Sequence, residues 1–260
     1  MKKYIVLFVG IASFMSSSAV LAEQSGVYLA PKLIYGHAIT DKLRGSTDYY
    51  SYFFDKNERI GNTSSSESDN IFGIGLSIGY DFNKRFEFPV RTELEYNIFS
   101  RSNTQNEVSV FEPPYNGTTL NGTHYMETKQ KLGIQTLFVN AYYDINTNTV
   151  FTPYVGGGVG VAFINVKQSG VDTFSTAPQN NNWASSERDV TNFAWNVGTG
   201  IAWNMNKNST IDLGYRYVNL GKVKGDSAVL YHPPGYIFTY GSQSGKVYMH
   251  QIAATLRIAY

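Results

Sequence analysis

The sequence contains no cysteine and little charge, with 16% of its 260 residues being Asp, Glu, Lys or Arg. A chain without cysteine forms no disulfide and has no free thiol to mispair, so hydrogen bonding and packing must hold the fold. The 21 basic and 20 acidic residues nearly balance. This balance gives no reason to expect a nucleic-acid partner.

Long apolar runs are also missing beyond the N-terminal segment. No later stretch approaches the roughly 18 consecutive apolar residues of a membrane helix, and the nearest is the glycine-rich segment Tyr154 to Ile164. If this chain crosses a membrane, strands must therefore do it.

The first 22 residues, MKKYIVLFVGIASFMSSSAVLA, have the pattern of a secretory signal peptide. Lys2 and Lys3 precede a short apolar run, and small residues end it at Ala22. We expect residues 1–22 to be cleaved and residues 23–260 to form one domain, rather than a retained membrane anchor. Removing Lys2 and Lys3 from the 21 basic residues leaves 19 against 20 acidic residues, a net charge of about −1.

A strict alternation of apolar residues with small or polar ones recurs along the chain. In FGIGLSIGYDF, residues 72–82, large apolar side chains alternate with Gly, Ser and Asp. A period of two indicates a strand with two unlike faces. Eight such segments are predicted as strands, of which the fourth is the least regular: residues 26–38, 72–82, 88–98, 132–145, 153–163, 193–204, 211–218 and 251–260.

The connections between these segments alternate in length. Three are short, asparagine-rich turns, at residues 83–86, 146–149 and 206–208, and four are long and polar, at residues 41–70, 101–128, 167–191 and 221–245. Such alternation is typical of bacterial outer-membrane barrels. The sequence therefore predicts an all-β, eight-stranded antiparallel up-and-down transmembrane β-barrel with long extracellular loops and short periplasmic turns. Pro31 lies within the first strand, where we expect a bulge or a water.

Side-chain size decides which face is outside. A soluble, lipocalin-like barrel would place Lys, Glu and Thr on its polar face, whereas the polar face here consists mainly of Gly, Ala, Ser and Asn. An eight-stranded barrel leaves an interior just wide enough for side chains. We therefore expect the apolar face to point into lipid, with girdles of aromatic residues at both ends. These are Tyr80, Phe82, Phe88, Tyr143, Trp203 and Tyr260 at the short-turn end, and Tyr35, Phe72, Phe163, Phe193 and Trp195 at the other.

Four runs carry a resemblance to a known family. RTELEY (91–96), LFVNAYYDI (137–145), PYVGGGVG (153–160) and DLGYRYV (212–218) resemble segments of the opacity-type outer-membrane proteins. The likeness covers the strands from about Val27 to Tyr260 and not the loops. It implies an eight-stranded barrel with divergent surface loops and a porin-like or adhesin function. Tyr260 departs from the phenylalanine that ends many such barrels.

Charged residues of both signs fall on the predicted inner face. They are Lys32, Arg91, Glu93, Glu95, Asp144, Asp212, Arg216 and Arg257. Charges in a narrow lumen are costly unless they are paired, and the near balance of signs favours a closed, ion-paired plug over an ion pathway.

No catalytic, metal-binding or cofactor site is predicted. The four histidines lack metal-ligand spacing, and His37 with Asp41 or His250 with Ser244 resembles a catalytic group that serine- and aspartate-rich loops produce by chance. The glycines of residues 156–160 do not complete a nucleotide-binding motif.

Two aromatic-rich segments in the long connections are the candidate partner-binding site. Their residues are Tyr49, Tyr50, Tyr52, Phe53, Phe54, Tyr231, Tyr236 and Phe238. Closure of the barrel pairs the last strand with the first, so these segments should be neighbours on the rim. Exposed aromatic patches mark interaction surfaces. The alternative is that the segments fold over the mouth or extend the strands above the membrane.

The leading hypothesis is a protein of the cell outer membrane whose extracellular loops bind a host-cell receptor or matrix component. The alternative is a small porin that passes ions or small solutes, and a structural barrel that tethers the envelope is less favoured because it would call for a periplasmic domain. Expected partners include outer-membrane lipid and lipopolysaccharide. We expect a monomer, with an oligomer as the alternative.

Overall fold

The computed structural model describes residues 26–51, 56–62, 66–111, 123–174, 182–224, 228–232, 236–240 and 244–259. The predicted signal peptide and the terminal Tyr260 lie outside these ranges. Within them, no helix has the length and apolar character needed to cross a membrane.

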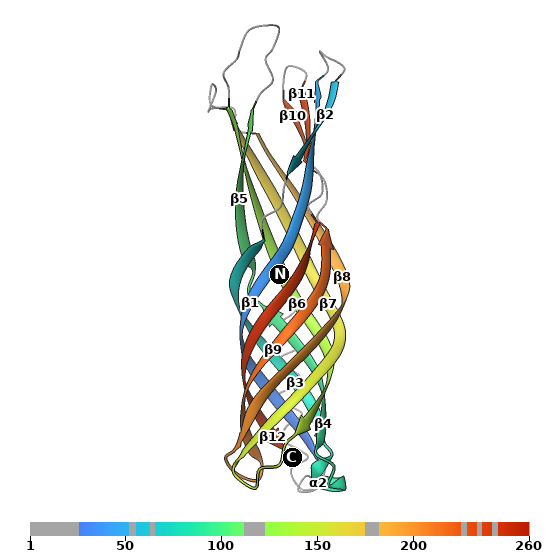
Figure 1. Cartoon of the computed structure of the whole chain (residues 1–260), viewed down its shortest axis with the longest axis vertical. Helices are drawn as coiled ribbons and strands as arrows, with labels where there is room; N and C mark the ends of the chain where they lie inside the picture. The colour runs from blue at the N-terminus through green and yellow to red at the C-terminus, as the bar shows by residue number, and fades with distance from the viewer. Residues whose placement is uncertain are drawn as a thin grey trace, which may run out of the picture.

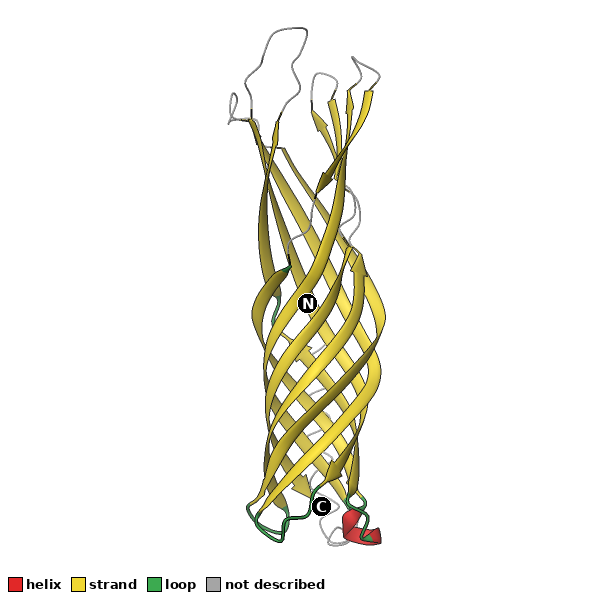
Figure 2. Ribbon diagram, viewed as in Figure 1, coloured by secondary structure: helices red, strands yellow, loops and turns green. Residues whose placement is uncertain are grey.

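Almost every described element is a β-strand (Figures 1 and 2). In chain order the elements are β1 (Val27–Ser51), β2 (Lys56–Asn62), β3 (Glu67–Asp81), α2 (Asn83–Phe86), β4 (Val90–Phe99), β5 (Ser102–Phe111), β6 (Thr123–Asp144), β7 (Phe151–Phe174), β8 (Asn182–Asn204), β9 (Ser209–Lys224), β10 (Ala228–His232), β11 (Tyr236–Tyr240) and β12 (Ser244–Ala259).

Eight antiparallel strands close into a barrel, as the sequence predicted: β1, β3, β4, β6, β7, β8, β9 and β12. Each of these eight pairs with the next one along the chain, and β12 pairs with β1. β5 continues the wall above β4 by pairing with β6. The pairing of β1 with β3 follows a single register from Val27↔Tyr80 to Thr40↔Glu67. From residue 73 of β3 down to the turn end, the described strands leave no unpaired edge, which a strand-built wall in lipid requires.

The two ends of the barrel differ, as Figure 1 shows. The one-turn helix α2 and the turns after β6 and β8 lie at one end, where the predicted short turns were placed. The hairpin β10–β11 and strand β2 lie at the other end, and both pair with the upper part of β1.

The four long connections are not loops throughout, and the predicted upper ends of the strands were wrong. β1 runs to Ser51, β7 to Phe174 and β9 to Lys224, while β8 already begins at Asn182. These extensions were missed because the segments are rich in polar residues, which the sequence analysis interpreted as loop character.

Glycines in the wall lie opposite large inward side chains of neighbouring strands. A Cβ on Gly73 would lie 2.5 Å from a ring carbon of Phe99, and a Cβ on Gly79 would collide with the ring of Tyr28. Asn97 similarly occupies the space beside Gly75. The glycines of FGIGLSIGYDF therefore make room for aromatic and amide side chains of adjacent strands, more than for charged residues across the lumen.

The bulge expected at Pro31 is absent. The pairs Leu29↔Ile258 and Lys32↔Thr255 on either side of it keep one register between β1 and β12. Pro31 costs ladder hydrogen bonds on one side without displacing the strand. Register shifts occur higher, and the one in β9 coincides with Gly221, whose φ of 81° suits a residue without Cβ.

Candidate functional site

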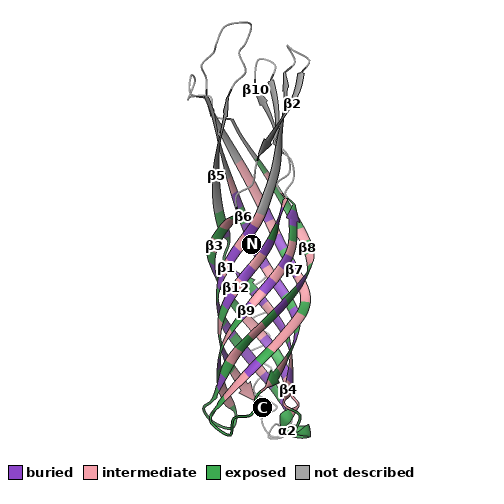
Figure 3. Ribbon diagram, in the orientation of Figure 1, coloured by how far each residue is buried: buried purple, intermediate pink, exposed green. Residues whose placement is uncertain are grey.

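The outer face of the lower barrel is a band of exposed apolar side chains. The larger members at its centre include Leu33, Ile74, Val139, Val159, Val197, Leu213 and Ile252. Aromatic residues of both predicted girdles are exposed at its margins, including Phe72 and Phe193 at the rim side and Phe88 and Trp203 at the turn side. The faces were therefore predicted correctly for this part of the barrel, and Figure 3 shows the alternation of exposed and buried positions.

Inside this band the structure brings the predicted lumen charges together. Glu95, which is fully buried, accepts hydrogen bonds from Lys32, from Asn97 Nδ2 at 2.7 Å and from Asn140 Nδ2 at 3.3 Å. Arg216 Nη1 lies 2.6 Å from Glu95 Oε1. Four donors around one carboxylate satisfy its acceptor capacity, as a buried charge requires.

A second carboxylate links this group to the rest of the network. Glu93 accepts hydrogen bonds from Lys32 Nζ at 2.7 Å and from the Tyr28 hydroxyl at 2.9 Å. Arg91 Nη1 lies 3.6 Å from Glu93 Oε1. Lys32 therefore joins the two glutamates, and Arg91 extends the network toward the turn end.

The turn end of the network consists of arginine and aspartate pairs. Arg91 Nε donates to both carboxylate oxygens of Asp144 at 2.9 and 3.0 Å, and Arg257 Nη2 donates to Asp212 Oδ1 at 3.0 Å. The Arg91 guanidinium also lies 4.7 Å from the ring centroid of Tyr142 and 4.5 Å from that of Tyr154. Cations between aromatic faces gain cation–π stabilisation when they are desolvated.

The four cations and four anions of this network are arranged as a plug. As whole residues, Lys32, Arg91, Glu93, Glu95, Asp212 and Arg216 are each less than 10% exposed. We define these six residues, with Asp144 and Arg257, as the charge layer. Its signs balance, so the interior at this level is filled by mutually paired groups.

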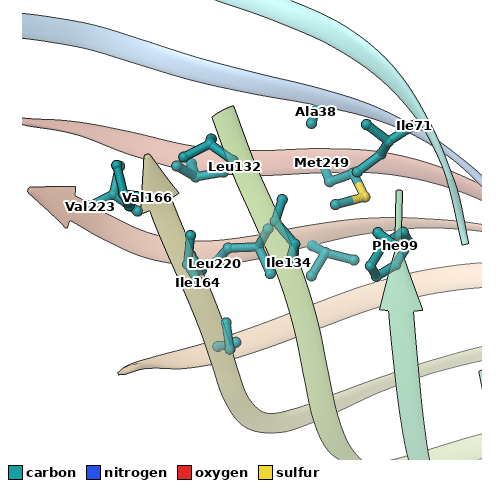
Figure 4. Close-up of a cluster of buried hydrophobic side chains, with 14 of the residues drawn as sticks. Ala38, Ile71, Phe99, Leu132, Ile134, Ile164, Val166, Leu220, Val223 and Met249 are labelled. Atoms are coloured by element: carbon teal, nitrogen blue, oxygen red, sulfur yellow. The ribbon is translucent and has the colours of Figure 1, made fainter. Parts of the chain in front are cut away.

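Above the charge layer the interior is apolar, which the sequence analysis did not predict. The buried residues that meet there come from all eight strands of the barrel, and Figure 4 shows most of them. They are Ile34, Ala38, Ile71, Phe99, Leu132, Ile134, Phe138, Ala162, Ile164, Val166, Ala194, Val218, Leu220, Val223, Val247 and Met249. We call this cluster the apolar layer. It closes the interior between the charge layer and the rim.

Toward the rim the outer surface becomes polar while the interior remains apolar. On β7 and β8 the outward side chains of Lys167 and Glu187 form an ion pair with 2.8 Å between Nζ and Oε2. Asn165 Nδ2 donates to Asp189 Oδ1 at 2.7 Å beside it. Both faces of the same strands therefore reverse their polarity, as expected of a wall that leaves lipid and enters water.

This reversal places the extended strands beyond the lipid-facing band. A transmembrane strand needs about 9–11 residues, and β7 has 24. About half of β7 is thus available to project from the membrane. The sequence analysis considered that segments of the long connections extend the strands above the membrane, and this part of the fold has that arrangement.

The rim carries the predicted aromatic segments. Backbone pairing places β1 beside β11, with Tyr49↔Phe238 and Ser51↔Tyr236, so the two segments are neighbours as predicted. Tyr231 lies in β10, paired with Ile237. Tyr52, Phe53 and Phe54 lie outside the described residues, and for the other five aromatics the structure describes the backbone alone.

His37 and His250 each have a hydrogen-bond partner other than the serine or aspartate noted in the sequence. His37 Nδ1 lies 2.8 Å from Asn70 Oδ1, and His250 Nδ1 lies 2.7 Å from the Tyr215 hydroxyl. Among the residues that the structure describes, no group of three or more His, Asp or Glu side chains is arranged to hold a metal ion.

A closed barrel with an apolar outer band, a polar plug and short turns at one end is an integral membrane β-barrel. The chain belongs to the outer membrane protein beta-barrel domain family, which matches residues 5–238. The protein is therefore located in the outer membrane, with its long-stranded end outside the cell.

Among known proteins the chain is similar to the outer membrane protein PagN of Salmonella typhimurium, with 31% identity over 163 residues. That match spans 62% of each chain, less than two thirds of PagN. A Rickettsia canadensis protein named as an adhesin candidate is 22% identical over 83% of this chain and 88% of its own length. These relatives are named as outer-membrane proteins and adhesins, not as enzymes.

Two solved structures are also similar. Neisserial surface protein A is 16% identical, with coverage of 91% of this chain and 98% of that chain and a TM-score of 0.39. OprG from Pseudomonas aeruginosa is 18% identical, with coverage of 89% and 98% and a TM-score of 0.40.

Proposed function

We propose that the protein is an adhesin whose extracellular rim binds a host-cell receptor or a matrix component. The observation that carries this proposal is the division of the barrel: the interior is closed by two layers of packed side chains, while the wall continues past the lipid-facing band to a rim of hairpins. This arrangement supports a binding role for the rim. The name of the Rickettsia canadensis relative supports the proposal.

The rigidity of the upper barrel supports a binding role. The apolar layer packs the extended strands from inside, and the ladder between β7 and β8 continues to Asp172↔Asn182. A rim on a rigid stalk presents its side chains with little loss of conformational entropy on binding. Aromatic residues are the side chains that dominate such interfaces, which makes the β1, β10 and β11 segments the proposed contact.

The direct test is adhesion of bacteria that display variants of the whole protein. One variant replaces Tyr49, Tyr50, Tyr52, Phe53, Phe54, Tyr231, Tyr236 and Phe238 by serine. A matched control replaces residues 112–119, in the connection between β5 and β6, by serine. Surface amount is checked by an epitope tag, and folding by the change in gel mobility on boiling.

We expect the aromatic variant to bind cultured host cells at least about tenfold less than the natural protein, because aromatic anchors contribute most of the binding energy of an interface. The control variant should bind within about twofold. Equal binding by the natural protein and a folded aromatic variant would contradict the site.

The porin alternative is not favoured by any described residue. The charge layer and the apolar layer both fill the lumen, and we expect no stable unit conductance in planar bilayers. A stable conductance that changes with Glu93→Gln or Arg216→Gln would overturn this expectation and identify the charge layer as an ion pathway.

A further inference from the structure

The wall of the upper barrel is interrupted between β3 and β5. The ladder between β3 and β4 ends at Gly73, and one further backbone hydrogen bond of 2.7 Å joins Ser100 N to Phe72 O. Above it a side chain takes the place of a strand, because the Asp69 carboxylate accepts the Asn103 N–H at 2.7 Å. Beyond Asn103, no described strand pairs with β5 on this side.

This interruption leaves one edge of β5 open, while β6 pairs with the other edge over the whole strand. Alternate residues of a strand direct their N–H and C=O groups to the same edge. Because the Asn103 N–H faces β3, the backbone groups of every second residue above it face the open edge. These residues are Gln105, Glu107 and Ser109. The residues between them form the ladder with β6.

The open edge of β5 is less guarded than others in the upper barrel. An open edge is a template for pairing with another chain, and proteins commonly protect it with charge, proline or shortness. β2 and the upper part of β8 also have one edge without a described strand partner. β2 carries three charged residues among seven, and β8 carries Glu187, Arg188 and Asp189 there. β5 has ten residues, no proline and Glu107 as its one charged residue.

The register between β5 and β6 indicates the chemistry that an added strand would carry. Glu107 lies directly opposite Glu127, and both share a face of the sheet with Lys131, which is exposed. Lys129 follows on the same face, so two acidic residues surround one cation at this level. Like charges directly opposite one another destabilise a sheet. A basic residue that a further strand places opposite Glu107 reduces this repulsion.

A second copy of this chain fits the edge less well. Two β5 strands that pair antiparallel about their middle bring Glu107 of one copy close to Glu107 of the other. The two acidic residues of each copy would then face those of its partner, and like charges across a pairing are unfavourable. Charge therefore favours a segment of a different protein.

We propose that the open edge of β5 binds an extended segment of a protein partner by strand addition. The backbone of Gln105, Glu107 and Ser109 bonds the backbone of the segment. A lysine or arginine of the segment lies opposite Glu107, and apolar residues lie on the face of Val108 and Val110. In this mode of recognition main-chain hydrogen bonds supply affinity, and alternate side chains supply specificity.

This site is separate from the contact proposed for the adhesin. In Figure 1, β5 lies at the left of the upper barrel, whereas β2, β10 and β11 lie at the right. Binding to the edge therefore requires none of the aromatic segments. It can be measured on the purified protein, apart from adhesion to cells.

The test is binding of a labelled peptide to the purified, detergent-folded full chain, followed by fluorescence polarisation. The peptide has the sequence TVTVKVTVT with blocked ends, and its two central valines carry N-methyl groups. These valines turn their nitrogens away from β5, so the peptide pairs through one edge only and does not self-associate. A matched peptide carries the N-methyl groups on the lysine and one threonine instead.

Two variants separate the backbone of β5 from its side chains. Q105P/S109P removes two N–H groups from the open edge and keeps the ladder to β6, because proline is tolerated on the outer side of an edge strand. Q105T/S109T is the control, since it changes the same side chains and keeps both N–H groups. Folding of each is checked by the change in gel mobility on boiling.

We expect Q105P/S109P to bind the peptide about tenfold more weakly than the natural protein, because two hydrogen bonds are lost. Q105T/S109T should bind within about twofold. The matched peptide should bind the natural protein about tenfold more weakly than the first. Equal binding by the two variants, equal binding of the two peptides, or no binding to the natural protein would overturn the site.

The preference for a basic segment is tested separately. Glutamate in place of the peptide's lysine should weaken binding at least about fivefold, and Glu107→Gln should reduce this difference. A preference for lysine that is absent, or that Glu107→Gln leaves unchanged, would contradict the assigned chemistry. A dimer of the protein without peptide that is lost in Q105P/S109P would identify a second copy as the occupant and overturn the proposed partner.

Discussion

The lower and upper halves of this barrel use the same wall in opposite ways. In the lower half an apolar outer face surrounds the charge layer and the lowest residues of the apolar layer, such as Phe138, whereas in the upper half the outer face is polar and the interior is apolar. The backbone ladder of β6 with β7 passes between the halves without a register shift. Which face is apolar therefore depends on whether lipid or water surrounds the barrel. The course of the backbone does not change between the two halves, because the same strand pairing continues through both.

The difference also explains how each half is closed. Charged side chains can fill the lower interior because four cations and four anions are positioned to form ion pairs. These ion pairs offset the cost of removing the charges from water. The upper interior is stabilised as a soluble barrel is, by burial of apolar area from water. Each half therefore has its own point of weakness, and substitutions should distinguish them.

The largest effect is expected from breaking the charge layer. Glu95→Gln removes the carboxylate that Arg216 and Lys32 share, and an uncompensated buried cation costs about 3–5 kcal/mol of unfolding free energy. Urea unfolding in lipid vesicles, followed by tryptophan fluorescence, measures this. Glu187→Gln, at an exposed ion pair of the upper half, is the control and should change little. Equal effects would mean that the charge layer is not desolvated.

The next effect sharpens the contrast on a single strand. Leu132 is inward and 2% exposed, and Leu137 is outward and 38% exposed, five residues away on β6. Leu132→Ala should lose about 2–5 kcal/mol because it leaves a cavity in the apolar layer. Leu137→Ala should lose less, because lipid chains fill the space. The same vesicle unfolding assay compares them, and an equal loss at both positions would argue against two different surroundings.

Introducing a charge on the outer face should have an effect that depends on height. Val197→Arg lies in the lipid-facing band of β8 and should cost about 2–4 kcal/mol near the bilayer midplane. Ser185→Arg lies on the same strand and the same face in the upper half, where water hydrates the charge. It should leave the unfolding midpoint nearly unchanged. A large loss at Ser185 would place the upper half in lipid.

The smallest of these effects concerns the glycines of β3. Gly75→Leu directs a large side chain into the space that Asn97 occupies, and overpacking of this kind costs about 1–3 kcal/mol. Ile74→Leu changes only the shape of a lipid-facing side chain. Yields of heat-modifiable barrel measure both, and equal yields would mean that the two faces of β3 were assigned the wrong way round.

Much of the lower half could be predicted from the sequence, because alternation and residue size identify both faces of a membrane strand. The inward charges are an example: Arg91, Glu93 and Glu95 share one parity on a single strand. Which side chains fill the space beside each glycine could not be predicted, since that depends on the register between strands. The residues that contact a partner at the rim remain a prediction.

The upper half was missed although a signal for it exists. On β6 the apolar residues Leu132 and Ile134 have even numbers, whereas Leu137 and Val139 have odd numbers, and no bulge separates them. Such a change of parity within one strand indicates that the medium outside the wall changes. The sequence analysis noted only irregularity in this segment and interpreted the polar outward residues beyond it as loops.

The central claim is that the wall leaves lipid and continues into water, and β8 allows the most direct measurement. The chain has no cysteine, so single cysteines at the outward positions Ile201, Val197, Phe193, Asp189 and Ser185 carry spin labels without background. Collision rates with oxygen, which favours lipid, and with a water-soluble nickel chelate report the medium. We predict a change from lipid to water between Phe193 and Asp189. Labels at Asp189 and Ser185 as lipid-exposed as that at Val197 would contradict the account.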